Sequence, residues 1–165
     1  MRCLGALDIA LWDIFGKLIE QPVYELLGGA ERNPFQTDNS KRHWATDLTP
    51  YATIVSDTWE REVILKQQIQ RCEILAQEGY RAFKVEAMHS SLQTAVDLVR
   101  EARKTLGPDA VLALDVGYGY NDHASALWVS ERIEQFDVYF LETPFAVDSP
   151  VPYARLADKT SIPLA

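Results

Sequence analysis

The chain has 165 residues, enough for one domain with a sizeable core, and its 24 acidic and 16 basic residues give a formal charge of −8. This charge disfavours nucleic acid and anionic membrane surfaces as partners, because both repel an acidic protein. No apolar run reaches the roughly 20 residues of a membrane span, and Asp8 and Asp13 interrupt the apolar N-terminal stretch, unlike a secretion signal. We therefore expect a soluble, cytoplasmic protein.

Two helices are predicted near the N-terminus. From Leu4 to Ile19 the apolar residues recur every three or four positions, which is the period of an amphipathic helix. The segment QPVYELLGG then predicts a short helix that stops at its two glycines. The polar stretch 31–49 has no clear period, and we interpret it as a connector.

Beyond residue 50, strands and helices alternate, with a repeat near the ~30 residues of a βα unit. The predicted strands are 51–55, 82–87, 110–116 and 138–142, with the start of a fifth in IPLA; the predicted helices are 61–77, 91–106, 124–136 and 153–158. Near-continuous apolar strands between amphipathic helices predict an α/β fold with a parallel sheet. A doubly wound open sheet and part of a parallel (β/α) barrel both fit, although no glycine-rich nucleotide-binding turn supports the first.

Carboxylates end two successive strands. Asp115 closes VLALD, and Glu142 closes VYFLE just before Pro144 breaks the strand. Since parallel strands lie ~4.8 Å apart with their carboxyl ends at one edge, both side chains could reach one ion, and Mg²⁺ prefers such oxygen ligands. In the preceding strand, Lys84 and Glu86 lie two residues apart and so share one face. Solvated acids or helix caps are the alternative interpretation, and spacing alone leaves both open.

An ordered set of motifs carries a family resemblance. ALDIALWDIFGKLIEQPVYELLGG resembles the helical end of the capping domain in the mandelate racemase and muconate lactonizing branch of the enolase superfamily. GYRAFKVEA, LALDVGYGY, FLETPF and SIPLA resemble its second to fifth barrel strands, in that order. The resemblance implies a remnant of the capping domain at 1–49, and the N-terminal half of the barrel, about strands 1–5, at 50–165. Within the branch, the segments are most similar to acid-sugar dehydratases.

The resemblance also implies a chemistry. In this family Mg²⁺ is held by strand-end carboxylates, and a base removes the proton α to the substrate carboxylate to give an enediolate. Asp115 matches the first metal ligand and Glu142 the second. Lys84 matches the first lysine of a Lys-x-Lys motif, and Glu86 stands in place of the second. We expect Lys84 and Glu86 to polarise the substrate or transfer a proton, in the dehydration or racemisation of a sugar acid.

The sequence departs from the family pattern at several positions. Gly117 stands where an asparagine often follows the first ligand, and Thr143 where a glutamate usually follows the second. The family's third metal ligand and its opposing base have no counterpart in these 165 residues. The chain therefore resembles a central fragment of the family's fold.

Two other hypotheses remain open. A non-catalytic half-barrel would leave strand edges unpaired, which predicts a homo-oligomer that covers them. An acidic flavodoxin-like receiver would use Asp115 as a lone strand-end acid, but it leaves FLETP without an explanation.

Overall fold

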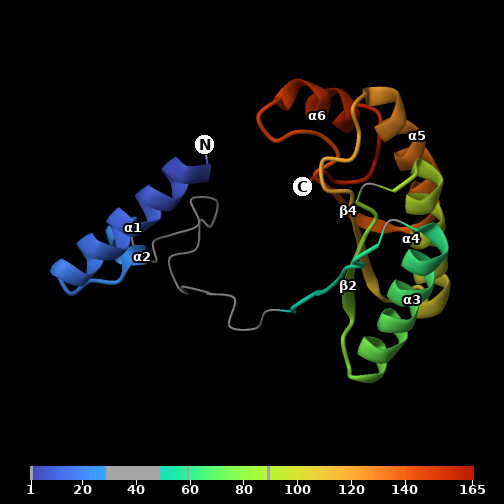
Figure 1. Ribbon diagram of the computed structural model, residues 1–165, viewed down its shortest axis with the longest axis horizontal. Helices are drawn as coiled ribbons and strands as arrows, with labels where there is room; N and C mark the ends of the chain where they lie inside the picture. The colour runs from blue at the N-terminus through green and yellow to red at the C-terminus, as the bar shows by residue number, and fades with distance from the viewer. Residues whose placement is uncertain (1, 29–48, 59, 89) are drawn as a thin grey trace, which may run out of the picture. The chain divides into compact units, whose positions relative to one another are not determined.

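The computed structural model describes residues 2–28, 49–58, 60–88 and 90–165 (Figure 1). Its contacts divide the chain into two compact units, Met1–Asp47 and Leu48–Ala165, and each is described by itself. The predicted connector at 31–49 lies almost entirely outside the described residues.

The described part of the first unit, residues 2–28, forms helices α1 (Arg2–Leu18) and α2 (Val23–Leu26), as the sequence predicts. The chain turns back sharply between them, and the Gln21 amide donates to the Gly16 carbonyl at 2.9 Å. Glycine suits this turn, because a Cβ at Gly16 would lie only 2.7 Å from the carbonyl oxygen of Gln21.

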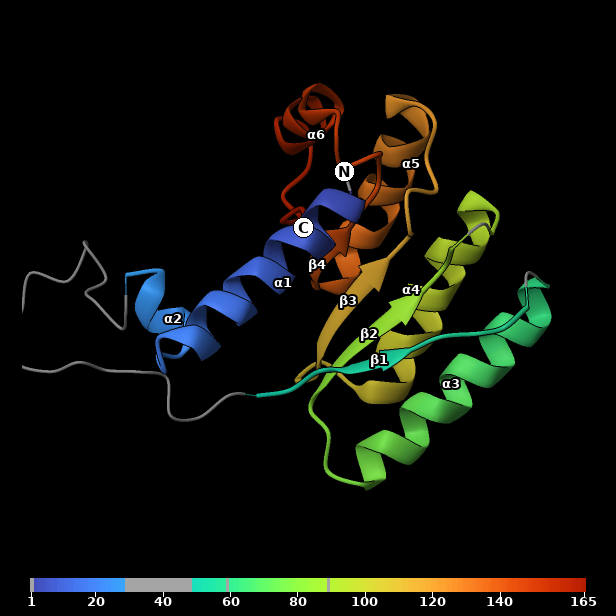
Figure 2. The ribbon, with the colours of Figure 1, turned by 60° about the vertical axis from the view of Figure 1, so that its left-hand side comes forward.

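The second unit alternates strands and helices. Its elements are β1 (Ala52–Ile54), α3 (Arg61–Gln77), β2 (Ala82–Glu86), α4 (Leu92–Leu106), β3 (Val111–Asp115), α5 (His123–Ile133), the 3₁₀ turn η1 (Glu134–Phe136), β4 (Val138–Glu142) and α6 (Pro150–Ala157). Within the described residues the four strands form one sheet in the order β1-β2-β3-β4, and every pairing is parallel. Helices α3, α4 and α5 lie along one face of it (Figure 2). The predicted α/β class and parallel sheet are confirmed.

The hydrophobic core lies between that face of the sheet and the helices. Phe83 and Val85 of β2 and Leu114 of β3 belong to it, together with Leu98 of α4, and all four are 1% exposed or less. Because side chains alternate along a strand, the residues between them on β2 and β3 point to the opposite face. The sequence of β2, AFKVE, therefore places apolar side chains in the core and charged ones on the other face.

A fifth strand begins at the C-terminal end of the described chain. Leu164 forms a parallel bridge with Leu141 of β4. The Leu141 amide donates to the Pro163 carbonyl at 2.9 Å, and the Ala165 amide donates to the Leu141 carbonyl at 3.0 Å. The prediction that IPLA starts another strand is confirmed.

Local capping explains where several helices differ from their predicted bounds. Asp122 accepts a hydrogen bond from the Ser125 amide, so α5 begins one residue earlier than predicted. The predicted helix 124–136 ends in a 3₁₀ turn, after which Asp137 adopts a positive φ of 50°. The last helix begins at Pro150, three residues earlier than predicted, because proline fits the first turn of a helix.

Shortening Leu114 should destabilise the second unit more than shortening Val111 on the same strand. Leu114 is fully buried and Val111 is 40% exposed. Leu114→Ala should lower the free energy of unfolding by about 2–5 kcal/mol, because it removes buried methyl groups and leaves a cavity. Val111→Ala should lower it by about 1 kcal/mol or less. Urea denaturation followed by circular dichroism measures both, and equal losses would contradict the described core.

Candidate metal and proton-transfer site

Three carboxylates form a row at the carboxyl edge of the sheet. Glu86, Asp115 and Glu142 are the last residues of β2, β3 and β4. The strand register pairs Glu86 with Asp115 and Asp115 with Glu142. In-register neighbours on parallel strands point to the same face, so the three acids occupy one face of the sheet.

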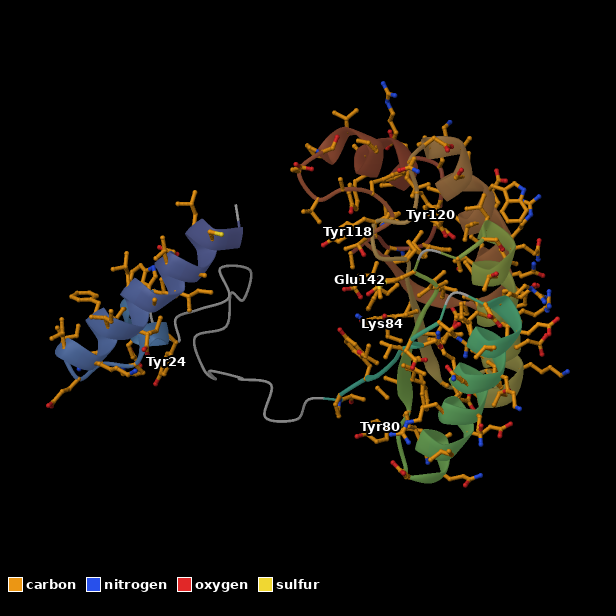
Figure 3. The ribbon with its side chains drawn as sticks, in the orientation of Figure 1. Tyr24, Tyr80, Lys84, Tyr118, Tyr120 and Glu142 are labelled. Carbon is orange, nitrogen blue, oxygen red and sulfur yellow. The ribbon has the colours of Figure 1, made fainter. Side chains whose placement is uncertain are left out.

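The side chain of Lys84 reaches into this row from β2. Its Nζ atom donates to Glu142 Oε2 at 2.6 Å and lies 3.4 Å from Asp115 Oδ2. Lys84 is buried, with 7% of its surface exposed. Figure 3 shows Lys84 and Glu142 on the side of the sheet away from α3 and α4. The two acids predicted as metal ligands therefore converge on one cationic group.

Asp115 is held in place by donors at its other oxygen. The Gly117 amide donates to Oδ1 at 2.9 Å, and the Thr143 hydroxyl donates to it at 3.0 Å. Gly117 has a positive φ of 49°, and a Cβ there would collide with the side chain of Met88. Glycine at this position thus fits a tight, left-handed turn.

Thr143 has a strained backbone. Its φ is 46°, a conformation that β-branched residues rarely adopt and that costs on the order of 1–3 kcal/mol. Hydrogen bonds hold it there: its amide donates to the Ala165 carbonyl at 2.8 Å, and its carbonyl accepts from the Tyr118 amide at 2.7 Å. From the sequence, Thr143 was noted only as a departure from the family pattern. Its contact with Asp115 was not predicted.

Gln68 of α3 supports the backbone of Glu86. Its Nε2 atom donates to the Glu86 carbonyl at 2.6 Å, and its Oε1 atom accepts from the Glu86 amide at 3.0 Å. The pairing of β1 with β2 ends at Ile54 and Val85, so this side-chain amide takes the place of a strand partner. Gln68 is fully buried. The only signal in the sequence is a polar residue on the buried face of a helix, and such a residue does not by itself predict a contact with a strand end.

The Tyr51 ring lies beside Lys84, and the Phe140 ring packs against that of Tyr51. Its Nζ atom is 5.5 Å from the centre of the Tyr51 ring, within the range of a cation–π contact. The ring of Phe140 lies 6.2 Å from that of Tyr51 in an edge-on arrangement. Neither ring was predicted from the sequence to belong to the site.

The charges of the row shift the pKa values of Lys84 and Glu86. Burial would lower the pKa of Lys84, but the hydrogen bond to Glu142 and the charges of Glu142 and Asp115 outweigh it and raise this pKa. Burial raises the pKa of Glu86, and the charge of Asp115 adds to this effect more than Lys84 offsets it. Lys84 is therefore held as an ammonium, and Glu86 accepts a proton more readily than an ordinary glutamate.

The donor set fits a hard divalent cation with water in its shell. Glu142 Oε2 and Asp115 Oδ2 face the same point, which Lys84 Nζ occupies. Nζ lies 2.6 Å from Glu142 Oε2 and 3.4 Å from Asp115 Oδ2. Mg²⁺ commonly binds through one or two carboxylates and keeps several waters. Among the described residues, no three His, Cys, Asp or Glu side chains gather closely enough to hold a metal by themselves.

Parallel βα units with acids at their carboxyl edge are typical of (β/α) barrel proteins, whose functional sites lie at the carboxyl ends of the strands. Residues 66–165 match the enolase C-terminal domain-like family, and residues 1–28 match the N-terminal domain of mandelate racemase and muconate lactonizing enzyme. The chain belongs to the mandelate racemase and muconate lactonizing branch of the enolase superfamily. Its fold is part of that superfamily's barrel.

Relatives of known activity include two sugar-acid dehydratases. The chain is 31% identical to D-galactonate dehydratase of Xanthomonas euvesicatoria pv. vesicatoria, with 100% of the chain and 40% of the relative covered. It is 26% identical to arabinonate dehydratase of Saccharolobus solfataricus, with 98% and 39% covered. The chain thus spans about 40% of the length of these relatives.

A solved structure of a mandelate racemase/muconate lactonizing protein from Paracoccus denitrificans, complexed with magnesium, is also similar. It is 27% identical, with a TM-score of 0.69, and the match covers 98% of this chain and 40% of that one.

No helix among the described residues has the length and apolar character needed to cross a membrane.

Replacing Glu86 by glutamine should stabilise the metal-free protein at neutral pH. The pKa of Glu86 is higher in the folded protein than its ordinary value of 4.5. Its favourable contribution to stability is therefore complete below pH 4.5 and is lost as the pH rises through the raised pKa. Glu86→Gln should melt higher than the unmodified chain at pH 7 in EDTA, and the difference should disappear in acid.

The exposed Glu62 of α3 provides the control. Glu62→Gln makes the same chemical change on helix α3, away from the row of acids, and should not raise the melting temperature at pH 7. Thermal melts between pH 4 and pH 8 measure the difference. A Glu86→Gln variant that is less stable than the unmodified chain across this range would contradict the described environment.

Proposed function

We propose that the chain carries part of the active site of a Mg²⁺-dependent enzyme that removes the proton α to a carboxylate through an enediolate. The reaction class is the dehydration, or the racemisation, of a sugar acid or hydroxy acid. The observation that carries this proposal is the convergence of Asp115 and Glu142 on one cation position, where Lys84 Nζ lies. Glu86 is the register neighbour of Asp115 on β2. The activities of the two dehydratase relatives and the magnesium in the Paracoccus structure support it.

The proposal gives each residue of the row a role. Asp115 and Glu142 would hold Mg²⁺, and the bound cation would stabilise negative charge that develops on the substrate oxygens. Glu86 is the candidate base, because its raised pKa makes it a better proton acceptor than an ordinary glutamate. Lys84 keeps its positive charge and could bind the substrate carboxylate. Gln68 holds the backbone of Glu86, and Thr143 holds Asp115.

The proposal also concerns the division of the chain. We assign residues 1–49 to the end of a capping domain and residues 50–165 to the N-terminal half of a barrel. The matches of residues 1–28 and 66–165 to the two domain families support this division.

Removing either proposed ligand should weaken magnesium binding. Asp115→Asn and Glu142→Gln should each reduce the affinity for Mg²⁺ by about tenfold or more, because a neutral amide is a poorer ligand for a hard cation. Isothermal calorimetry measures the affinity. Asp109→Asn is the control, because Asp109 is an exposed acid just before the amino end of β3 and should not affect binding. An unmodified chain that binds no Mg²⁺ would refute the proposed metal site.

The proton-transfer role has a more sensitive test than complete turnover. Galactonate and arabinonate are incubated with the chain and Mg²⁺ in D₂O, and exchange of the α-proton is followed by NMR. Exchange should occur and should fall by about 10²-fold or more in Glu86→Gln, which removes the proposed base. Formation of a 2-keto-3-deoxy acid would extend the result to dehydration. Exchange at the same rate in Glu86→Gln would rule out Glu86 as the base.

A second candidate function, self-association without catalysis, is favoured by exposed apolar side chains on the strands. Val55 follows β1, the edge strand, and Tyr139 lies on β4; both are more than half exposed. An exposed strand edge with apolar residues can pair with another copy of the chain. We propose a homo-oligomer on this basis.

Charge at the edge should weaken this association. Val55→Lys should shift the chain toward the monomer and weaken self-association by about tenfold or more, because lysine on an edge opposes strand pairing. Sedimentation velocity over a range of concentrations measures it. A substitution of Lys66, which is exposed on α3, is the control and should leave the self-association unchanged. A chain that is monomeric at all concentrations would remove this candidate.

A further inference from the structure

Lys84 occupies the position at which the two proposed metal ligands meet. Its Nζ atom is 2.6 Å from Glu142 Oε2 and 3.4 Å from Asp115 Oδ2. Asp115 and Glu142 are register neighbours on adjacent strands, so their negative charges lie close together. An ammonium between them offsets that repulsion, and its burial shows that the contact belongs to the packed interior of the site.

The oxygens that face Lys84 are the ones a metal would need. Asp115 Oδ1 already accepts hydrogen bonds from the Gly117 amide and the Thr143 hydroxyl, at 2.9 Å and 3.0 Å. Oδ2 is the Asp115 oxygen directed at Lys84, and Oε2 is the corresponding oxygen of Glu142. A divalent cation that bound both acids through these oxygens would therefore take the place of the ammonium.

We propose that Lys84 is a built-in competitor of the divalent cation: its ammonium neutralises Asp115 and Glu142 in the metal-free protein and must leave them when the metal binds. This inference rests on the proposed metal site. The exchange moves one cation out and another in, and it needs no proton transfer. The affinity of the site for metal is then lowered by the free energy of the Lys84 contacts.

The structure provides what this exchange requires. Asp115 keeps its orientation when Lys84 leaves, because Gly117 and Thr143 hold its other oxygen. The lysine stem is long and flexible, so the ammonium can move while the backbone of β2 stays in the sheet. The Tyr51 ring, 5.5 Å from Nζ, offers a nearby aromatic face on which the displaced cation can rest.

The decisive variant is Lys84→Met, which keeps an unbranched side chain one atom shorter than lysine and removes its charge. Calorimetry with Mg²⁺ alone should show binding at least about tenfold tighter than in the unmodified chain, equivalent to about 1.4 kcal/mol. Lys66→Met, with the same change on the exposed surface of α3, should leave the affinity unchanged. The double variant Lys84→Met/Asp115→Asn should lose the gain, which locates the tighter binding at this site.

The outcomes separate this inference from the proposed function. Equal or weaker binding in Lys84→Met overturns the competition and leaves the metal site intact. Absence of binding in both the unmodified chain and Lys84→Met overturns the metal site, and the inference with it. Tighter binding in Lys84→Met that depends on Asp115 supports both the proposed metal site and the competition by Lys84.

A second measurement uses the unmodified chain and so does not depend on how a variant folds. Amine-reactive labelling followed by mass spectrometry reports the accessibility of each lysine. Labelling of Lys84 should be slow without metal, because it is buried and ion-paired, and should rise several-fold when Mg²⁺ is added. Labelling of Lys66 should not change. A rate at Lys84 that is unaffected or lowered by saturating Mg²⁺ would overturn the displacement.

Discussion

The parallel register of β2, β3 and β4 is the constraint on which the candidate site depends. It places Glu86, Asp115 and Glu142 side by side at the ends of three strands, where their charges repel one another. Burial strengthens this repulsion, because less water screens it. Lys84 is the cation that the fold itself supplies, and its two contacts allow the acids to remain close together. The site is therefore built around a positive charge, whether lysine or metal provides it.

Much of the surrounding structure serves to hold this row. Thr143 and Gly117 both have positive φ angles at the points where β4 and β3 end, and both donate to the same oxygen of Asp115. At Thr143 this conformation is strained; such strain persists only where other interactions determine the conformation, and it is frequent at functional sites. Gln68 has a comparable role at the end of β2, where its amide satisfies the backbone of Glu86. The ends of β2, β3 and β4 are thus each held by a different contact, made by Gln68, Gly117 and Thr143 respectively.

The presence of an acid, Glu86, on the same face of β2 as Lys84 sets the electrostatic balance of the site. Where the family's Lys-x-Lys motif would place two positive groups on this strand, the chain has one lysine and a third acid. Burial and the neighbouring acids raise the pKa of Glu86, and Lys84 only partly offsets them. A carboxylate with a raised pKa is a stronger base than an ordinary one, which suits the proton transfer proposed for Glu86.

The sequence by itself determined the order of strands and helices, the parallel sheet and the acids that end β3 and β4, because periodicity and strand-end polarity are local properties of the chain. It could not determine that Lys84 bridges those two acids, since that contact joins residues 31 and 58 positions apart. The same holds for Gln68 and Thr143, whose roles arise from contacts with other elements. Only the tertiary structure decided these, because strand register and the direction of each turn fix which side chains meet.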